Sequence, residues 1–336
     1  MASLLRGEPV AENVRRRIRE KCEALQRKRV IPTLGIVRVG SRGNDIAYER
    51  GAVKQARALG VDVKRFLFDE TVSIEDLRRT LEAINADPGI HGCLIFRPLP
   101  PHLDEMQLSG ILRPEKDADV ITAAAMGQMV TRTGNDFAPC TAAACLELLR
   151  YYRIPLKGKR VTVIGKGINV GLSIALLLLN EEATVSVCHI FTAPAEVRRL
   201  CREAEIIVSA AGCAGLIGAE HVRPGQIVID VGVNTGADGK ICGDADFSAV
   251  EPVVQAVTPV PGGVGAITSC ILMEHVVDAA VRSVQKPLQE LNFSVTYKTP
   301  GRGRFSGSPR CFLLILNGGG VFHLYIVSSC IVNTLW

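Results

Sequence analysis

A strand, a glycine-rich turn and the start of a helix follow one another in RVTVIGKGINVG, residues 160–171. The first five residues are typical of a buried strand, and Gly165, Gly167 and Gly171 stand where the chain passes into the helix. Glycines at such a turn let backbone amides approach a pyrophosphate, whose charge the helix N-terminus attracts. The stretch therefore predicts a dinucleotide-binding turn. The alternative is a strand-to-helix turn whose glycines serve only the backbone.

The next predicted strand, residues 183–188, ends without an acidic side chain. NAD-specific folds usually place Asp or Glu there to bind the ribose hydroxyls. Residues 187–192 read VCHIFT, and Lys166 in the turn can face a 2′-phosphate instead. We therefore expect NADP, with NAD as the alternative. His189 in this segment is either functional or a strand-end histidine with its hydrogen bonds satisfied.

Strands and helices alternate outward from this stretch in both directions. Such alternation implies a parallel sheet with helices over its faces. We predict an α/β fold of two domains flanking a cleft, the second a Rossmann-like dinucleotide-binding domain with a parallel sheet. The predicted strands are 32–39, 61–68, 90–96, 160–164, 183–188, 206–210 and 226–230, and the predicted helices are 9–27, 45–59, 73–86, 170–180 and 268–284.

The composition is that of an ordinary globular protein. The chain has 336 residues, of which 47% are hydrophobic and 22% charged, and this excludes wholesale disorder or a fibre. The net charge is +5, but residues 287–336 hold four basic residues against Glu290, so residues 1–286 carry only +2. A nearly neutral body has no electrostatic footprint for nucleic acid, and we expect no such partner.

The eleven cysteines are scattered, without a C-x-x-C pair or histidines at zinc spacing. We therefore expect no metal site and a reducing compartment. The two leucines at positions 4 and 5 are too few for the apolar region of a signal peptide. Together these features predict a cytoplasmic protein.

The last fifty residues differ from the rest of the chain. Residues 287–336 contain no aspartate but hold seven of the sixteen aromatic residues, including Trp336. Residues 311–336 carry no charge, yet the run 317–320, NGGG, divides them into pieces shorter than the ~20 apolar residues of a spanning helix. We predict an atypical, poorly ordered tail and no membrane partner.

Several dispersed motifs appear in the order found in one enzyme family. Residues 4–285 resemble the methylenetetrahydrofolate dehydrogenase/methenyltetrahydrofolate cyclohydrolase family, bifunctional enzymes of folate one-carbon metabolism. The most specific motif is TPVPGGVGAIT at 258–268, and the others are PEKDAD at 114–119, PCT at 139–141, DVGVN at 230–234 and GDADF at 243–247.

The resemblance implies a folate-binding catalytic domain over residues 1–145, joined by a closing helix at 268–286, and an NAD(P)-binding domain over 146–267. It also implies a homodimer. It assigns Tyr48 and Asp119 to catalysis and substrate binding. It further assigns Pro261, Gly262 and Gly263 to the substrate, and Gly165, Lys166, Gly167, Gly171, Ile190 and Val233 to the cofactor.

Two departures from the family pattern concern its catalytic pair. The family has a lysine four residues after the tyrosine, on the same helix face, but this chain has Ala52 after Tyr48. Lys54 does not substitute, because six helical residues at about 100° each place it opposite Tyr48. The family glutamine before the L-P-L motif is replaced by Phe96. The chain is identified as a variant without the catalytic lysine.

Milder departures affect the turns around both ligands. The family G-R-S turn reads GKG at 165–167, and Ile190 replaces a serine, which removes phosphate-binding groups. Val120 replaces a glycine and Ala142 a proline, changes that we expect to reshape the pterin pocket.

These observations predict NADP-dependent oxidation of 5,10-methylenetetrahydrofolate to 5,10-methenyltetrahydrofolate, with weak or absent cyclohydrolase activity. Hydride transfer needs alignment, whereas hydrolysis also needs assisted proton movement. The alternatives are a fully bifunctional enzyme, an unrelated nicotinamide oxidoreductase, and a folate- or nucleotide-binding protein without catalysis. The motif at 258–268 argues against the unrelated oxidoreductase.

Overall fold

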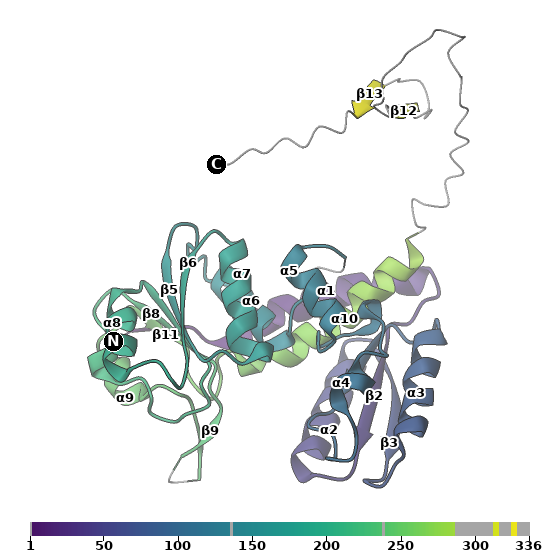
Figure 1. The fold of residues 1–336 in the computed structure, drawn as a ribbon, viewed down its shortest axis with the longest axis horizontal. Helices are drawn as coiled ribbons and strands as arrows, with labels where there is room; N and C mark the ends of the chain where they lie inside the picture. Colours follow the sequence, from purple (N-terminus) through teal and green to yellow (C-terminus); the bar gives the residue numbers. More distant parts are fainter. Residues whose placement is uncertain (1, 135–136, 237–238, 286–311, 316–323, 328–336) are drawn as a thin grey trace, which may run out of the picture. The chain divides into compact units, whose positions relative to one another are not determined.

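The computed structural model describes residues 2–134, 137–236, 239–285, 312–315 and 324–327 (Figure 1). The chain divides into a unit over residues 1–284 and a second over 285–336. In the second unit, β12 (Phe312–Ile315) pairs antiparallel with β13 (Leu324–Val327). The rest of the predicted tail lies outside the described residues. None of the helices described is long and apolar enough to cross a membrane.

The first domain is built on a parallel three-stranded sheet in the order β3-β2-β4. Its helix α3 begins as the sequence predicts, with Ser73 Oγ accepting a hydrogen bond from the Asp76 amide at 3.1 Å. This cap satisfies one of the free amides of the first turn. The elements are β2 (Thr33–Val39), α2 (Gly43–Ala58), β3 (Asp62–Phe68), α3 (Ile74–Ala86), β4 (Gly92–Ile95), α4 (Glu105–Ser109) and η1 (Pro114–Lys116).

The second domain contains a parallel six-stranded sheet in the order β1-β11-β8-β7-β5-β6. The predicted strand, glycine turn and helix are present, although the helix opens with the π-helical turn η2. The strands are β1 (Ser3–Leu4), β5 (Arg160–Ile164), β6 (Thr184–Cys188), β7 (Ile206–Ser209), β8 (Ile227–Asp230) and β11 (Ala256–Val257). Around them lie η2 (Ile168–Leu172), α7 (Ser173–Asn180), α8 (Pro194–Glu203), η3 (Ala219–His221), β9 (Asn234–Thr235), β10 (Ile241–Cys242) and α9 (Phe247–Val250).

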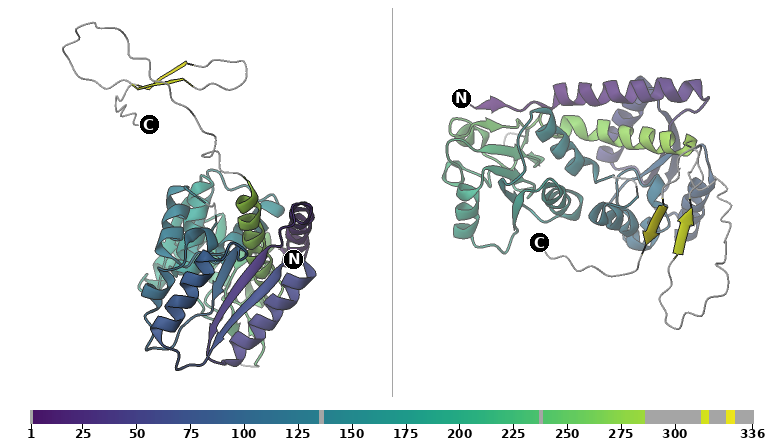
Figure 2. Two further views of the ribbon diagram at one scale, coloured as in Figure 1. Left: turned by 90° about the vertical axis from the view of Figure 1, so that its right-hand side faces the viewer. Right: turned by 90° about the horizontal axis from the view of Figure 1, so that it is seen from above.

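Longer helices connect the two sheets. Helices α1 (Gly7–Arg27) and α10 (Gly265–Val284) lie side by side (Figure 2), near α5 (Ala123–Thr131) and α6 (Cys140–Tyr151). Arg17 on α1 forms ion pairs with Glu147 on α6 at 2.5 Å and with Glu274 on α10 at 2.9 Å. Burial alone raises the pKa of Glu274, but hydrogen bonds and charges from Arg17 and Lys21 outweigh it and hold that pKa below its usual value. Glu274 is therefore ionised at neutral pH and ties α1 to α10.

The domain boundaries differ from those predicted. Strand β1 pairs with β11, so the chain starts in the sheet of the second domain, not in the domain predicted for residues 1–145. Helix α6 crosses the predicted boundary between residues 145 and 146. The closing helix begins at Gly265 rather than 268. A two-residue strand has no measurable periodicity, which is why the sequence did not reveal β1.

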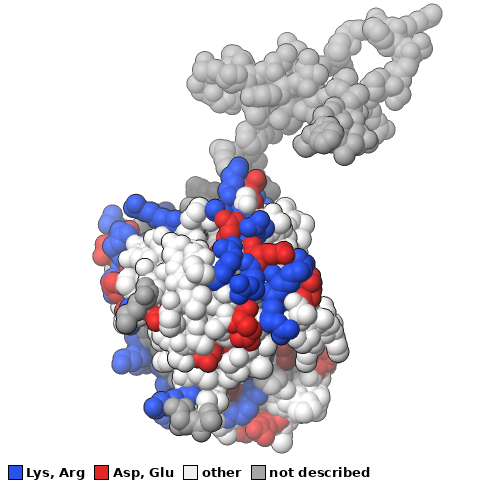
Figure 3. All heavy atoms as spheres, turned by 90° about the vertical axis from the view of Figure 1, so that its left-hand side faces the viewer, with Lys and Arg blue, Asp and Glu red and all other residues white. Residues whose placement is uncertain are grey.

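Charged side chains on the second domain pair locally. Arg199 on α8 contacts Glu196 at 2.5 Å and Glu203 at 2.7 Å, one helical turn away on either side. On the face shown in Figure 3, lysines and arginines lie among aspartates and glutamates. Such exposed pairs contribute little to stability, because water and salt screen their charges.

We expect a chain that ends at Lys286 to keep its thermal unfolding midpoint and its turnover. The hydrophobic clusters described are built from residues between Leu5 and Val284, so the first unit contains a core of its own. Differential scanning calorimetry and activity of the shortened chain check this. Loss of soluble, active protein would show that residues 287–336 belong to the core or to an interface.

Candidate active site

A cavity of about 590 Å³ lies where the strands of the first domain end. Tyr48 on α2, Phe96 after β4 and Asp119 after η1 line it, together with Asn169 from the glycine turn of the second domain. The predicted residues Tyr48 and Asp119 are therefore brought together. Ligands of parallel sheets bind at the carboxyl ends of the strands, and this cavity has that position.

Tyr48 packs against the residue that replaces the family glutamine. Its ring meets Phe96 edge to face, with centroids 5.7 Å apart. Tyr48 is 44% exposed, but the atoms packed around its hydroxyl group keep water away from that group. This desolvation raises the pKa of Tyr48, and electrostatic interactions with Cys140 and Asp119 raise it further. Tyr48 is thus a neutral hydrogen-bonding group at neutral pH, with a ring face available for stacking.

Ala52 lies one helical turn after Tyr48 and is buried, at 3% exposure. It belongs to the same apolar cluster as Phe96. Lys54 is exposed and does not line the cavity. Two buried apolar side chains therefore stand beside Tyr48 where the family pattern has a lysine and a glutamine.

Hydrogen bonds from backbone amides to the carboxylates of Asp117 and Asp119 hold the loop that carries Asp119. The Cys140 amide donates to Asp119 Oδ1 at 3.3 Å, and Asp117 accepts from the amides of Ile121 and Thr122 at 3.1 and 2.8 Å. Burial raises the pKa of Asp117, against the hydrogen bonds that lower it. These contacts hold the Asp119 carboxylate at the rim of the cavity.

Val120 has a φ of +53°, in the left-handed region that a β-branched residue rarely adopts. This geometry explains why the family pattern has glycine here. The side chain is buried, at 1% exposure, in a small cluster with Ala125 and Phe137. The loop therefore adopts the left-handed turn with valine in place of the glycine that favours this conformation.

Sequence analysis missed an ion pair on the cavity wall. Arg97 Nη1 lies 3.1 Å from Glu105 Oε1, and the same carboxylate accepts from the Leu99 amide at 3.3 Å. The other charged residues on the wall are Asp45 and Asp119. Arg97 directly follows Phe96, but a single arginine after a strand has no pattern that points to a site.

The glycines of the predicted dinucleotide turn have different roles. A Cβ on Gly165 would lie 2.2 Å from the Ala210 carbonyl oxygen, and one on Gly171 would lie 2.0 Å from the Gly165 carbonyl oxygen. A Cβ on Gly167 would meet nothing within 4 Å. Gly165 and Gly171 therefore allow strand and helix to approach closely, whereas Gly167 stands at an open position.

A second cavity, of about 530 Å³, follows this turn. Gly165, Lys166, Gly167 and Ile190 line it, as predicted, whereas Gly171 lies behind them. Lys166 is exposed, so its ammonium group is free to meet an anion. His189 Nδ1 accepts a hydrogen bond from the Phe191 amide at 3.2 Å, which favours the interpretation of this histidine as a satisfied strand-end residue.

A third cavity, of about 320 Å³, lies beside the loop at 258–268. It brings together Val233, predicted for the cofactor, and Pro261, Gly262 and Gly263, predicted for the substrate. Gly262 has a φ of +102°, and its carbonyl accepts from the Gly7 amide at 2.8 Å. The backbone of this loop therefore stands open toward the cavity.

Two buried aspartates shape the loops around the second and third cavities. Asp244 accepts hydrogen bonds at 2.7–3.2 Å from Ser209, Ala211, Gly212, Cys213 and Asn234. Asp230 accepts from the amides of Gly232, Asp244 and Ala245 at 2.8–3.0 Å. Burial raises the pKa of Asp230 to about 6, although these amides oppose the shift. Asp230 and Asp244 lie in the motifs DVGVN and GDADF, but the sequence did not indicate that the Asp244 amide donates a hydrogen bond to Asp230.

The geometry defines a two-domain α/β protein with a glycine turn typical of dinucleotide binding and with cavities beside this turn and at the strand ends of the first domain. The family model for the tetrahydrofolate dehydrogenase/cyclohydrolase catalytic domain matches residues 5–119, and the model for the NAD(P)-binding domain of the same family matches residues 139–284. The chain belongs to the tetrahydrofolate dehydrogenase/cyclohydrolase family, as the motifs predicted.

This chain matches its relatives over nearly all of their length. The chain is 43% identical over 281 residues to the bifunctional protein FolD of Carboxydothermus hydrogenoformans, covering 83% of this chain and 97% of that one. The structure of the bifunctional FolD of Campylobacter jejuni matches with a TM-score of 0.81 and 33% identity, over 84% of this chain and 99% of that chain. The Trypanosoma brucei dehydrogenase-cyclohydrolase, solved with NADP and an inhibitor, matches over the same shares with a TM-score of 0.79 and 34% identity.

We expect Gly171→Ala to destabilise the protein by about 1–3 kcal/mol and to weaken dinucleotide binding, because the added methyl group overpacks the turn. Gly127→Ala is the matched control. A Cβ at Gly127, on exposed α5, meets nothing within 4 Å, so this change raises stability by up to about 1 kcal/mol. Urea unfolding and cofactor titration measure both effects. Equal stability of the two variants would contradict the close approach at Gly171.

The raised pKa of Asp230 predicts a pH dependence of stability. The folded pKa of about 6 lies above the unfolded value of about 3.9, so the folded state binds more protons between these values. The contribution of Asp230 to the free energy of unfolding therefore falls as pH rises from 4 to 6. Relative to Asp230→Asn, the unaltered protein is expected to lose stability over this range.

Exposed Asp246 is the control for this measurement, because its carboxylate caps α9 and hydrogen bonds lower its pKa. Its contribution has the opposite sign and is lost as pH falls. Urea unfolding of Asp230→Asn and Asp246→Asn from about pH 3 to pH 7 measures both, because the contribution of Asp246 is lost below its unfolded pKa of about 3.9. The same slope for both variants would contradict the assignment.

Proposed function

We propose that this protein oxidises 5,10-methylenetetrahydrofolate to 5,10-methenyltetrahydrofolate with NADP and releases the product largely unhydrolysed. The observation that carries the proposal is the pair of buried apolar residues beside Tyr48. Ala52 and Phe96 stand there, while Tyr48, Asp119 and the glycine loops are retained. The site keeps the groups that align two ligands and lacks the lysine and the glutamine of the family pattern.

The oxidation is chemistry of the substrate and the cofactor. The methylene carbon loses a hydride to the oxidised nicotinamide, and a folate nitrogen supplies the electron pair that leaves a delocalised methenyl cation. The protein must hold the two carbons in line, which is a matter of positioning. In this proposal Tyr48 stacks on the folate, and Asp119 accepts hydrogen bonds from its amino-pyrimidine edge.

Hydrolysis of the methenyl cation demands more of the protein. Water adds to the methenyl carbon, a proton leaves that water, and a folate nitrogen gains a proton when the ring opens. A lysine with a glutamine partner is suited to this work, and proton transfer by a positioned side chain contributes about 10²–10⁴-fold. Ala52 and Phe96 have no titratable atom, Tyr48 stays protonated because its pKa is raised, and Arg97 is held by Glu105.

The preference for NADP is supported by Lys166, which is exposed beside the dinucleotide turn, and by the lack of an acid at 187–192. The related enzyme of Trypanosoma brucei was solved with NADP. The open position at Gly167 and the exposed Ile190 offer no hydroxyl to a phosphate. In this proposal Lys166 therefore supplies the main contact to the 2′-phosphate.

A cytoplasmic homodimer completes the proposal. Strand β6 lies at the edge of its sheet, and Leu172, Leu179 and Val187 near it expose 39–52% of their surface. A second copy of the chain would cover these apolar groups. The cysteines described are all free thiols, most of them buried, which suits a reducing compartment.

The second candidate is a fully bifunctional enzyme, which is favoured by the names of the related bifunctional FolD proteins. Two assays on one preparation distinguish the candidates: oxidation of methylenetetrahydrofolate with NADP, and hydrolysis of methenyltetrahydrofolate compared with buffer. NADP binding without turnover would instead indicate a binding protein.

We expect the unaltered protein to hydrolyse methenyltetrahydrofolate no faster than about a hundredth of its rate of oxidation, given the lost proton-transfer group. Hydrolysis as fast as oxidation would show that another residue has taken over the role of the lysine. The double variant Ala52→Lys with Phe96→Gln is expected to raise hydrolysis more than Ala52→Lys alone. An amine beside Phe96 lacks a partner that orients it, whereas the glutamine amide supplies one.

We expect Lys166→Ala to raise the Kd for NADP about tenfold and to leave that for NAD nearly unchanged, because a charge-assisted contact to the 2′-phosphate contributes about 1.5–3 kcal/mol. Fluorescence titration with both cofactors measures this. The control is Lys54→Ala, which removes an exposed lysine that lines none of the three cavities. Equal losses for both cofactors would contradict the role of Lys166.

A further inference from the structure

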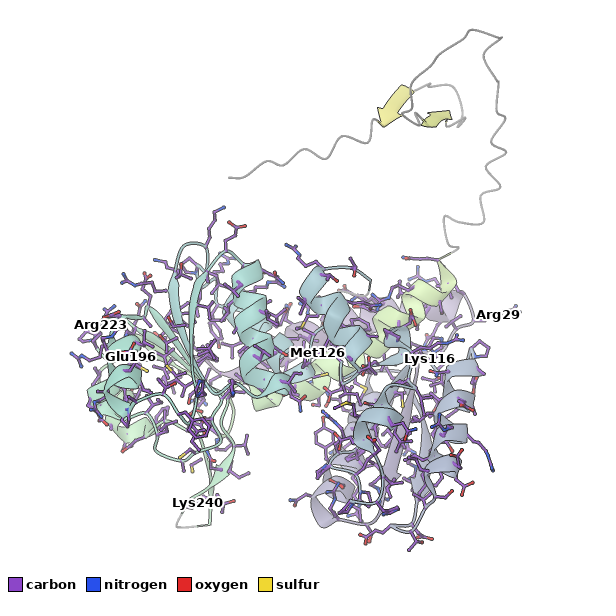
Figure 4. All side chains as sticks on the ribbon, viewed as in Figure 1. Arg29, Lys116, Met126, Glu196, Arg223 and Lys240 are labelled. Atoms are coloured by element: carbon purple, nitrogen blue, oxygen red, sulfur yellow. The ribbon has the colours of Figure 1, made fainter. Side chains whose placement is uncertain are left out.

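A fourth cavity, separate from the active-site cavities, lies among α1, α5, α6, α7 and α10. Its volume is about 530 Å³, and none of its lining residues borders the other three. We call it the helical cavity, and in Figure 4 Met126 marks α5 beside it. Apolar side chains, among them Phe137, Leu146, Leu177 and Ile271, share its walls with a larger number of charged and polar side chains. The volume falls within the usual range for small-molecule sites, roughly 300–1,000 Å³.

His275 on α10 presents an unpaired ring nitrogen to this cavity. Nδ1 lies 2.9 Å from the Ala118 carbonyl oxygen, and a carbonyl only accepts, so Nδ1 bears the proton. Burial lowers the pKa of His275, so the ring is neutral and Nε2 is a bare acceptor. Nε2 contacts no donor among the described residues.

The side chain is only 8% exposed, and it lines the helical cavity. Among the described residues no fully buried side-chain nitrogen or oxygen lacks a partner. Nε2 is therefore reached from the cavity, and it is positioned to accept a hydrogen bond from a molecule bound there. The ring stacks on Phe137 with centroids 4.2 Å apart, so both residues favour a flat ligand.

Acidic and basic side chains both lie on the wall of the helical cavity. The four acids on the wall pair with basic residues: Glu147 and Glu274 with Arg17, Asp278 with Lys21, and Glu181 with Arg150. Arg132 follows α5 and is exposed, and it forms no ion pair or hydrogen bond through its side chain with any described residue. The guanidinium group of Arg282 lies 4.3 Å from the centre of the Phe137 ring.

We propose that the helical cavity binds an aromatic carboxylate that also carries a hydroxyl group. The ring packs among Phe137 and the aliphatic side chains, the hydroxyl donates to His275 Nε2, and the carboxylate meets Arg132. Each part of the ligand satisfies a group on the wall that the folded chain leaves unsatisfied. The site is distinct from the folate and dinucleotide cavities and does not depend on the reaction proposed for them.

The probe is 4-hydroxybenzoate, titrated into the full-length protein by calorimetry. We expect saturable binding, at least tenfold weaker for benzoate, which lacks the donor, and for 4-hydroxybenzyl alcohol, which lacks the charge. Arg132→Gln is expected to weaken binding of the probe about tenfold. Arg153→Gln is the matched control, because Arg153 is also exposed and has a φ of +53° against +55° for Arg132, but lies outside the cavity.

A second measurement follows His275 itself in the protein with an unaltered site. In protein labelled with ¹⁵N-histidine, the probe is expected to shift the Nε2 resonance of His275, assigned by its loss in His275→Asn. Absence of binding, equal losses for Arg132→Gln and Arg153→Gln, or an unchanged His275 resonance at saturation would each overturn the proposal.

Discussion

The carboxylates of Asp230 and Asp244 hold together the loops on which both cofactor cavities depend. Between them they accept hydrogen bonds from six backbone amides at the ends of β7 and β8 and in the 243–245 turn. A Cβ on Gly243 would lie 1.9 Å from Asp230 Oδ2, so the turn must pass this carboxylate without a side chain. Buried carboxylates are costly unless such donors surround them. The hydrogen bonds to these two carboxylates therefore position the loops that carry Cys213 in the second cavity and Val233 in the third.

The cavity proposed for the folate is shaped by aromatic packing and not by a buried carboxylate. The rings of Tyr48 and Phe96 line one side of the cavity, and Ala52 is buried one helical turn after Tyr48. An apolar wall aligns a flat substrate well but leaves charge and proton transfer to solvent. Arg97 and Glu105 satisfy each other on the far wall. In the proposed function, such a site favours a reaction limited by alignment over one limited by proton movement.

Much of the fold was predictable because its signals are local. The apolar run, the glycines at 165 and 171 and the Ser73 cap depend on residues a few positions apart, and each element is present. Strand β1 and the two-residue strands β9, β10 and β11 were not predicted, because segments so short have no period. Arg97 was missed for another reason, since its partner Glu105 is recognised only when the loop is folded.

The sequence by itself determined the family and the glycine turn, and it has Ala52 and Phe96 where the resemblance implies a lysine and a glutamine, because these depend on residue identity and spacing. Only the tertiary structure decided how these residues are arranged. It placed Ala52 and Phe96 in one cluster against Tyr48, held Val120 in a left-handed turn, and left one ring nitrogen of His275 facing a cavity. The physical reason is that burial and hydrogen-bond pairing are set by residues far apart in the chain, such as His275 and Ala118, whose contact no local pattern encodes.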